Sequence, residues 1–286
     1  MEEDNRMKYK IIENKSNYNT NFLDSIIIKQ LSFLKGIFNI EEYNNNTYTF
    51  YFVNDDVSLS EVVDNKIVVN TRKDIDEELQ IERIRIIVRH ELVHIFSEVW
   101  GYPCPLFFEG TAIYYSDNLI RKERLGYDYH ALCRAFLEND VLLPLDNYLL
   151  PRKFYSSQPD YRILIETGSF YGFLLDYFGF NKVRKVYEDY KCPTIDEPVM
   201  MINPLLKSIF NKDLTELQSM WKNYLQNQVV ENVELSKKYT MEFFREAGFN
   251  FRQQYIHCNI CHYPFSVEKE KCPNCGADRD IVVKVI

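Results

Sequence analysis

The chain has 286 residues, of which 46% are hydrophobic and 27% are charged, and its formal net charge is −8. This composition excludes a disordered or fibrous chain, and the length allows one large domain or two unequal ones with a substantial core. The acidic balance argues against general binding to nucleic acid or to anionic membranes.

Nothing in the sequence directs the chain to a membrane or to an oxidising compartment. Its first residues, Met1-Glu2-Glu3-Asp4, lack the positive start and the apolar run of a secretory signal. No segment approaches the roughly 20 consecutive apolar residues of a membrane-spanning helix. We therefore expect a cytoplasmic protein without a membrane partner, in which Cys104, Cys133 and Cys192 are reduced and packed.

The N-terminal part of the chain predicts a helix followed by a strand. Residues 1–20 are polar, and we expect no regular structure there. Residues 21–40 repeat apolar side chains at helical spacing and predict an amphipathic helix. The aromatic run from Tyr48 to Val53 predicts a strand.

Two short segments on either side of Asp64-Asn65 predict a β-hairpin. Ser58–Val63 and Lys66–Asn70 flank Asp64-Asn65, which has the composition of a hairpin turn. We expect the second segment at an edge of the sheet. There it either binds an extended peptide by strand addition or forms a plain sheet edge.

The segment His90-Glu91-Leu92-Val93-His94 has the pattern H-E-x-x-H and lies in an apolar-periodic stretch from about Asp76 to Trp100. Residues four apart lie on one side of a helix, so both imidazoles can reach one metal ion. Glu91 lies about 100° round the helix from His90, where it can act as a general base on a water molecule at that metal. The opposite side carries apolar residues that we expect to be buried: Ile84, Val88, Leu92, Ile95, Phe96 and Val99. The alternative is that the two histidines are structural and only make hydrogen bonds.

A second helix is predicted at Leu106–Tyr115, after a segment with one Gly and two Pro that ends the first helix. Its single acid, Glu109, stands among apolar residues, where an unpaired carboxylate costs several kcal/mol. Fourteen residues lie between His94 and Glu109, which lets the chain reverse and bring the carboxylate opposite the histidines. Two His nitrogens, one Glu oxygen and an open position form the ligand set of catalytic zinc peptidases.

These two segments together resemble the gluzincin clan of metallopeptidases. H-E-x-x-H followed by a helix with F-x-E-G-x-A-x-Y, here Phe107–Tyr114, is similar to the peptidase MA-like branch related to thermolysin and to alanyl aminopeptidases. Similarity of size and polarity extends over residues 20–228, through a third helix at Glu166–Gly179 and a closing helix at Leu214–Leu225. The resemblance implies an α+β fold with a thermolysin-like zinc peptidase domain, made of a small N-terminal β-sheet and a helical part.

The chain departs from that family in two places. It lacks the G-x-M-E-N segment with which the aminopeptidases hold a free amine, so endopeptidase and exopeptidase action both stay open. The family's oxyanion-stabilising Tyr corresponds to Ile165 in this chain. Tyr161, one helical turn earlier, is our candidate for that role, with Tyr155 and Tyr171 as alternatives.

His130 and Cys133 are three residues apart and offer a second pair of metal-ligating side chains. A lone His-Cys pair is more often part of a core or a surface than a metal site. We therefore expect these two residues to be structural.

Residues 249–286 predict a separate zinc ribbon. Two C-x-x-C knuckles ten residues apart have the spacing of a tetrahedral four-thiolate site, with ligands Cys258, Cys261, Cys272 and Cys275. A segment of this length cannot build a core alone, and we therefore expect the metal to supply its folding energy. Ile281–Ile286 predicts a last strand. The ribbon is not clearly basic, so we expect it to bind a protein or the peptidase domain itself rather than nucleic acid. H-E-x-x-H with such a ribbon is also similar to SprT-like proteases of DNA-bound proteins, but those take a third His where this chain offers Glu109.

The sequence therefore predicts a zinc metallopeptidase domain at residues 1–248, followed by the ribbon. We expect a peptide or protein substrate, Glu91 as general base, one structural zinc in the ribbon, and one catalytic zinc on His90, His94 and Glu109. One alternative is a catalytically silent zinc-binding scaffold whose ribbon mediates protein or nucleic-acid interaction. Another is a peptidase that acts only on its own chain.

Overall fold

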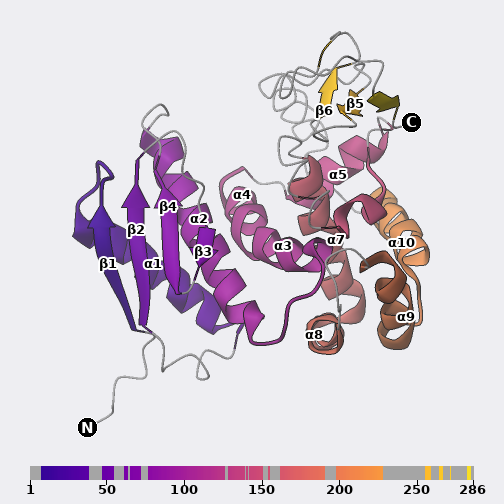
Figure 1. Cartoon of the computed structure of the whole chain (residues 1–286), viewed down its shortest axis with the longest axis horizontal. Coiled ribbons are helices and arrows are strands. Elements are labelled where there is room, and N and C mark those ends of the chain that lie inside the picture. The colour runs from indigo at the N-terminus through magenta and orange to yellow at the C-terminus, as the bar shows by residue number, and fades with distance from the viewer. Residues whose placement is uncertain are drawn as a thin grey trace. The chain divides into compact units, whose positions relative to one another are not determined.

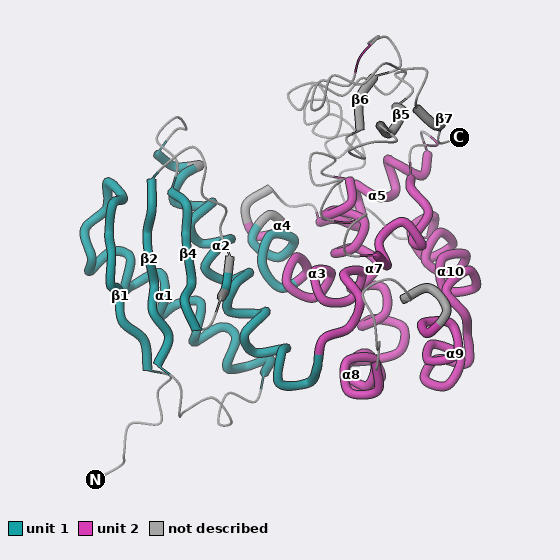
Figure 2. Tube along the Cα trace, viewed as in Figure 1, with its two compact units in different colours: residues 1–101, 115–120 teal, residues 102–114, 121–286 magenta. Residues whose placement is uncertain are grey.

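The structure, a computed structural model, belongs to the α+β class and consists mostly of helices with two small sheets (Figure 1). It describes residues 8–38, 47–54, 61–63, 65–71, 77–125, 128–138, 140, 142–150, 154, 162–190, 198–227, 255–258, 264–266, 271 and 282–284. The chain divides into two compact units, coloured separately in Figure 2. Unit 1 comprises Met1–Gly101 and Tyr115–Ile120, and unit 2 comprises Tyr102–Tyr114 and Arg121–Ile286.

Unit 1 contains a four-stranded sheet with the order β1-β2-β4-β3. The strands are β1 (Lys8–Asn14), β2 (Thr47–Val53), β3 (Glu61–Val63) and β4 (Lys66–Asn70). Strands β1, β2 and β4 run parallel, and β3 pairs antiparallel with β4. The turn between β3 and β4 includes Asn65, whose φ of 65° lies in the left-handed region that Asn tolerates, as the predicted hairpin requires.

Two expectations for this sheet were wrong. Residues 8–14 form a strand rather than irregular chain; they pair with β2 through the backbone while their side chains stay exposed or half-buried, so their sequence carries no buried alternation. Strand β4 is not the edge strand, because β3 pairs with it over Lys66–Val68. Strand addition at β4 would therefore have to displace β3.

Two helices, α1 (Thr20–Lys35) and α2 (Glu77–Glu98), pack behind this sheet (Figure 1). Helix α1 begins where the Asn19 side chain accepts a hydrogen bond from the Phe22 amide at 2.9 Å. The face of α2 predicted to be apolar is buried at Ile84, Val88, Leu92, Ile95 and Phe96. Val99 was wrongly expected to be part of it, because the helix ends at Glu98 and the Val99 side chain is 53% exposed.

The helical part of unit 2 starts with α3 (Pro105–Ile113). The same helical stretch continues as a π-helical turn at Tyr114–Asn118 and as α4 (Leu119–Leu125), and its residues Tyr115–Ile120 belong to unit 1. The third and closing helices predicted from the sequence are α7 (Arg162–Phe178) and α10 (Leu214–Asn227). The remaining helices of the described residues are α5 (Tyr129–Glu138), the 3-10 turn η3 (Leu145–Tyr148), α8 (Phe180–Asp189) and α9 (Pro198–Phe210). None of the helices among these residues is long and apolar enough to cross a membrane.

Glycines bring α3 and α7 unusually close together. A Cβ atom on Gly110 would lie 2.9 Å from the Thr167 carbonyl oxygen, and one on Gly168 would lie 2.7 Å from Ile113 Cγ2. Such distances are below any normal contact, so each position needs glycine for close approach of the helices. The contact fixes α3, the helix that carries Glu109, against the core of unit 2.

The C-terminal part contains a three-stranded antiparallel sheet with the order β6-β5-β7. Its strands are β5 (Tyr255–Cys258), β6 (Pro264–Ser266) and β7 (Val282–Lys284), and β7 confirms the last strand predicted from the sequence. Cys258 is the last residue of β5, but its side chain, like the whole of Cys261, Cys272 and Cys275, lies outside what the structure describes.

Gly110→Ala tests whether this close approach of the helices matters for stability. Alanine favours a helix by about 1 kcal/mol over glycine, but here its methyl group would meet the Thr167 carbonyl. We expect the steric clash to outweigh the higher helix propensity of alanine. The free energy of unfolding, measured by urea titration, should fall by about 1–2 kcal/mol.

Gly36→Ala is the matched control, because its nearest neighbour, the Phe33 carbonyl oxygen, would lie at an ordinary 3.5 Å. It should change the stability by less than about 0.5 kcal/mol. Equal effects of the two substitutions would contradict the assigned role of Gly110.

Candidate metal centre

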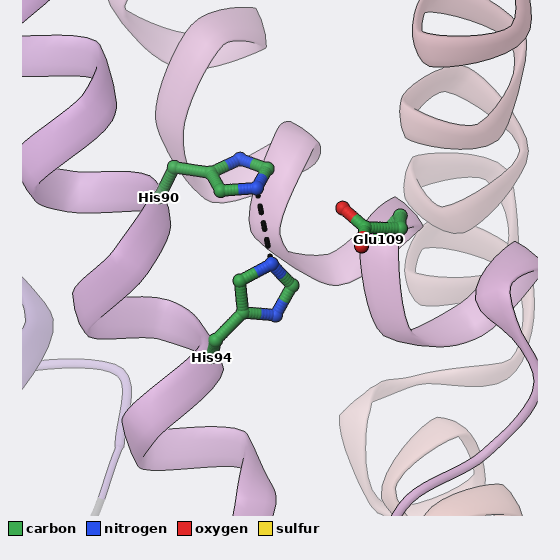
Figure 3. A group of neighbouring side chains, drawn as sticks. All are labelled: His90, His94 and Glu109. Carbon is green, nitrogen blue, oxygen red and sulfur yellow. Dashed lines mark hydrogen bonds between the residues drawn. The ribbon is translucent and has the colours of Figure 1, made fainter. Parts of the chain in front are cut away.

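His90 and His94 lie one helical turn apart on α2 and direct their imidazoles at the same point (Figure 3). Their Nε2 atoms are 3.0 Å apart, and the two rings are nearly perpendicular, with an interplanar angle of 83°. Two nitrogens bound tetrahedrally at about 2.05 Å from one zinc ion would be about 3.3 Å apart. The pair is therefore already close to the spacing that a shared metal ion imposes.

Glu109 completes a group of three possible metal ligands. The ligand atoms of His90, His94 and Glu109 all lie within 4.8 Å of one another, and Figure 3 shows the carboxylate facing the two rings. The two histidines are half-buried, and Glu109 is 9% exposed. Among the residues that the structure describes, this is the group that could hold a metal ion, and it is the one predicted from the sequence.

The donor set of this group fits zinc. Two imidazole nitrogens and one carboxylate oxygen are the ligands of catalytic zinc sites, which leave a fourth position open. Imidazole and carboxylate also suit other first-row transition metals, so the donors alone do not select zinc among them. A buried carboxylate beside two imidazoles gains most from a cation that all three share.

Glu91 follows His90 on α2 and is 5% exposed, so the predicted general base is a buried carboxylate. It lies on the same helix as both histidines, at the position directly after the first His where the motif H-E-x-x-H requires Glu. The next acid on this side of α2, Glu98, is exposed and comes four residues after His94. Burial raises the pKa of Glu98, and the proximity of His94 partly offsets this shift.

Hydrogen bonds from α8 hold the turn of α3 on which Glu109 lies. The Tyr187 hydroxyl donates to the Phe107 carbonyl oxygen at 2.9 Å and also contacts the Thr111 hydroxyl. Thr111 in turn donates to the same Phe107 carbonyl at 2.9 Å. Both hydroxyls belong to buried side chains and find their partners within unit 2, so Tyr187 of α8 ties down the helical turn that carries Glu109.

The structure does not bear on the expected oxyanion donor. Tyr161 and Tyr155 lie outside the described residues. The other alternative, Tyr171, is 1% exposed and packs against Tyr114 with the ring centroids 5.7 Å apart. Tyr171 is thus a core residue of the contact between α3 and α7. Ile165, which takes the place of the family's Tyr, is also buried.

His130 and Cys133, which we expected to be structural, lie on α5 and have hydrogen-bond partners within unit 2. His130 Nδ1 lies 2.9 Å from the Ser169 hydroxyl, which also accepts a hydrogen bond from Trp221 Nε1 at 3.1 Å. The Cys133 thiol donates to the Ile165 carbonyl at 3.7 Å and also makes a hydrogen bond with Ser169, so Ser169 contacts both side chains. Both are buried, and burial raises the pKa of the Cys133 thiol.

Arg89, directly before His90, is a feature that the sequence analysis did not single out. Its side chain is only 2% exposed, although charged residues are rarely buried. One feature of the sequence could have indicated this burial: Arg89 directly follows the apolar run Ile86-Ile87-Val88 on α2.

Comparison of the chain with protein-family models, with curated proteins and with solved structures gave no match. The resemblance to the gluzincins therefore rests on the motif residues themselves. Any statement about activity has to be argued from the chemistry of the site.

His130 predicts a pH dependence of stability. Burial lowers its pKa, which outweighs the opposing effect of the Asp128 and Asp176 carboxylates and is reinforced by Lys122. The unfolded chain, with a His pKa of about 6.5, therefore takes up the proton first. The stability contributed by neutral His130 is complete above that pH and is lost as the pH falls through the lower pKa of the folded state, by up to about 1.4 kcal/mol per pH unit.

Urea unfolding at pH 7.5 and at pH 5.5 measures this effect. We expect the wild type to lose more stability over this interval than His130→Asn, which can keep a hydrogen bond to Ser169 but does not titrate. Equal losses in the two proteins would show that His130 does not carry the pH dependence.

Proposed function

We propose that this protein is a zinc-dependent peptidase that hydrolyses peptide bonds, with a thermolysin-like domain at residues 1–248. The observation that carries the proposal is the convergence of the ligand atoms of His90, His94 and Glu109 within 4.8 Å of one another. The buried Glu91 of the same H-E-x-x-H segment supports it. A purely structural histidine pair would need neither the third ligand nor the adjacent acid.

In this proposal His90 Nε2, His94 Nε2 and a Glu109 carboxylate oxygen hold the zinc ion. When bound, zinc lowers the pKa of a water molecule and polarises the carbonyl of the scissile peptide bond. The Glu91 carboxylate takes the proton from the attacking water and delivers it to the leaving amine nitrogen. Glu91 is 5% exposed and directly follows His90 on the same helix, next to the proposed metal ligands.

The architecture of unit 1 and of the helices after it supports a thermolysin-like arrangement. A small sheet precedes the H-E-x-x-H helix α2, and the acid follows on the next helix, α3. Tyr161 stays our proposed oxyanion donor, by its position four residues before Ile165 in the sequence. The proposed ligands and general base are common to endopeptidases and exopeptidases, and the proposal does not choose between the two.

We further propose that residues 249–286 form a zinc ribbon with Cys258, Cys261, Cys272 and Cys275 as ligands of a second, structural zinc. The three short antiparallel strands β5, β6 and β7 support it, since β5 ends at the first of these cysteines. A ribbon of this composition would bind a protein or the peptidase domain.

Zinc content is the first prediction of this proposal. Purified full-length protein should contain two zinc ions per chain by elemental analysis. Glu109→Ala and His90→Ala should each reduce the content to one after dialysis against a mild chelator, because each removes one of three ligands. Cys272→Ser should remove the other ion.

Glu216→Ala, which removes an exposed acid of α10 from its ion pair with Lys212, serves as the control and should keep both ions. A Glu109→Ala protein that retains two ions would exclude Glu109 as a ligand. A wild type with zinc only in the ribbon would favour an interaction module without a catalytic centre.

Activity provides a separate prediction. Glu91→Gln keeps the size of the side chain but removes its ability to accept a proton. We expect this variant to keep both zinc ions and to lose activity on unfolded protein substrates by at least about a hundredfold. Glu98→Gln is the control, and its activity should stay within about threefold of wild type.

Retained activity in Glu91→Gln would contradict the assigned general base. A shortening of the chain with time in the wild type, but not in Glu91→Gln, would identify the protein as a peptidase that acts on its own chain.

A further inference from the structure

The guanidinium of Arg89 joins three helical segments of unit 1. Its Nε donates a hydrogen bond to Gln30 Oε1 on α1 at 2.7 Å, and its Nη1 donates to the Tyr115 carbonyl oxygen at 3.4 Å. Its Cζ lies 4.1 Å from the centroid of the Phe33 ring, in a cation–π contact. The side chain that precedes His90 is therefore fixed in position from several sides.

The Tyr115 carbonyl belongs to the π-helical turn Tyr114–Asn118. A π-helical turn widens the helix and redirects its carbonyl groups, and such turns occur frequently at functional sites. The Arg89 guanidinium supplies a donor to one of these carbonyls. The turn is also packed, because the Tyr115 ring lies edge-on to Phe38, with the centroids 5.5 Å apart.

This turn continues the helix that carries the third proposed ligand. Helix α3 ends at Ile113 and the π-helical turn begins at Tyr114, so Glu109 lies six residues before Tyr115 on one uninterrupted helical stretch. Arg89 and His90 are neighbours on α2. The hydrogen bond from Arg89 thus links the helical turn of His90 to the helical stretch of Glu109.

Arginine is suited to this task. Its planar group donates in several fixed directions, so one residue can bind the Gln30 side chain and the Tyr115 carbonyl together while stacking on Phe33. A lysine has the same charge but not the fork of donors. The burial of so polar a group is costly unless its hydrogen bonds are made, so the arrangement strongly favours one relative position of the segments it joins.

We propose that Arg89 is a positioning residue of the metal centre: it sets the geometry of the three ligands by fixing the π-helical turn that follows Glu109 to the turn of α2 that carries His90. The proposal rests on the proposed function, in that it takes His90, His94 and Glu109 as the ligands. It assigns Arg89 no contact with the metal or with the substrate.

The test is the zinc affinity of full-length variants, measured by competition with a chelator. Partners that orient metal ligands typically contribute about 10–100-fold to metal affinity. We expect Arg89→Met to weaken zinc binding at this site by at least about tenfold and Arg89→Lys to weaken it by a smaller factor of at least about fivefold. The four ribbon cysteines are the same in all variants, so differences in affinity report on the other site.

A double-mutant cycle separates positioning from a general loss of structure. If Arg89 acts through Glu109, then Arg89→Met should weaken zinc binding by less than about twofold on a Glu109→Ala background, where the third ligand is already gone. Arg184→Met, which removes an arginine from an exposed ion pair with Glu188 on α8, is the matched control and should leave the affinity unchanged. Urea unfolding of each variant shows whether it is folded under the assay conditions. If Arg89→Met is unfolded there, the zinc affinity of Arg89→Lys decides the question.

Zinc affinity within about twofold of wild type in the folded Arg89 variants would overturn the proposal. So would a loss that is equally large with and without Glu109, because it would then not pass through that ligand. If Glu109→Ala itself leaves the zinc affinity unchanged, the three-ligand site and the proposed function fail, which is a different result from a silent Arg89.

Discussion

Glu109 has 9% of its surface exposed, and this one buried acid constrains much of the structure around it. An isolated carboxylate in such a position would be strongly destabilising, so its place has to be fixed relative to groups that compensate it. The glycine contact between α3 and α7 and the hydrogen bonds of Tyr187 with the Glu109 turn achieve this within unit 2. Two imidazoles and a shared metal ion supply the compensation in the function that we propose.

The two sides of the proposed site depend on different levels of structure. His90 and His94 meet because residues four apart on any helix are neighbours, so their geometry follows from local structure alone. Glu109 reaches its position only through tertiary packing, from the close approach at Gly110 to the hydrogen bonds of Tyr187. The metal affinity of such a site therefore depends on residues that never contact the metal.

This difference also explains what could be predicted from the sequence. The helix of H-E-x-x-H and its buried face followed from apolar spacing, except at Val99, which comes just after the helix end. The strand at Lys8–Asn14 was missed because an edge strand held by backbone hydrogen bonds needs no buried side chains of its own. Glu109 was predicted to be a ligand because an acid inside an apolar helix is rare, but no local pattern indicated the π-helical turn after it.

Arg89 shows why the supporting residues are the hardest to recognise. A charged residue on an amphipathic helix is normally assigned to the solvent-exposed face, and the only sign to the contrary that we identify in the sequence is the apolar run Ile86-Ile87-Val88 directly before it. Its burial becomes understandable only when its partners are known, and these come from α1 and from the turn after α3, about 60 residues before and 26 residues after it in the chain. A group with several fixed donors costs more to leave unsatisfied than an apolar side chain gains by packing, so it specifies one arrangement of its neighbours. A metal site whose ligands come from separate helices needs such a constraint more than it needs additional stability.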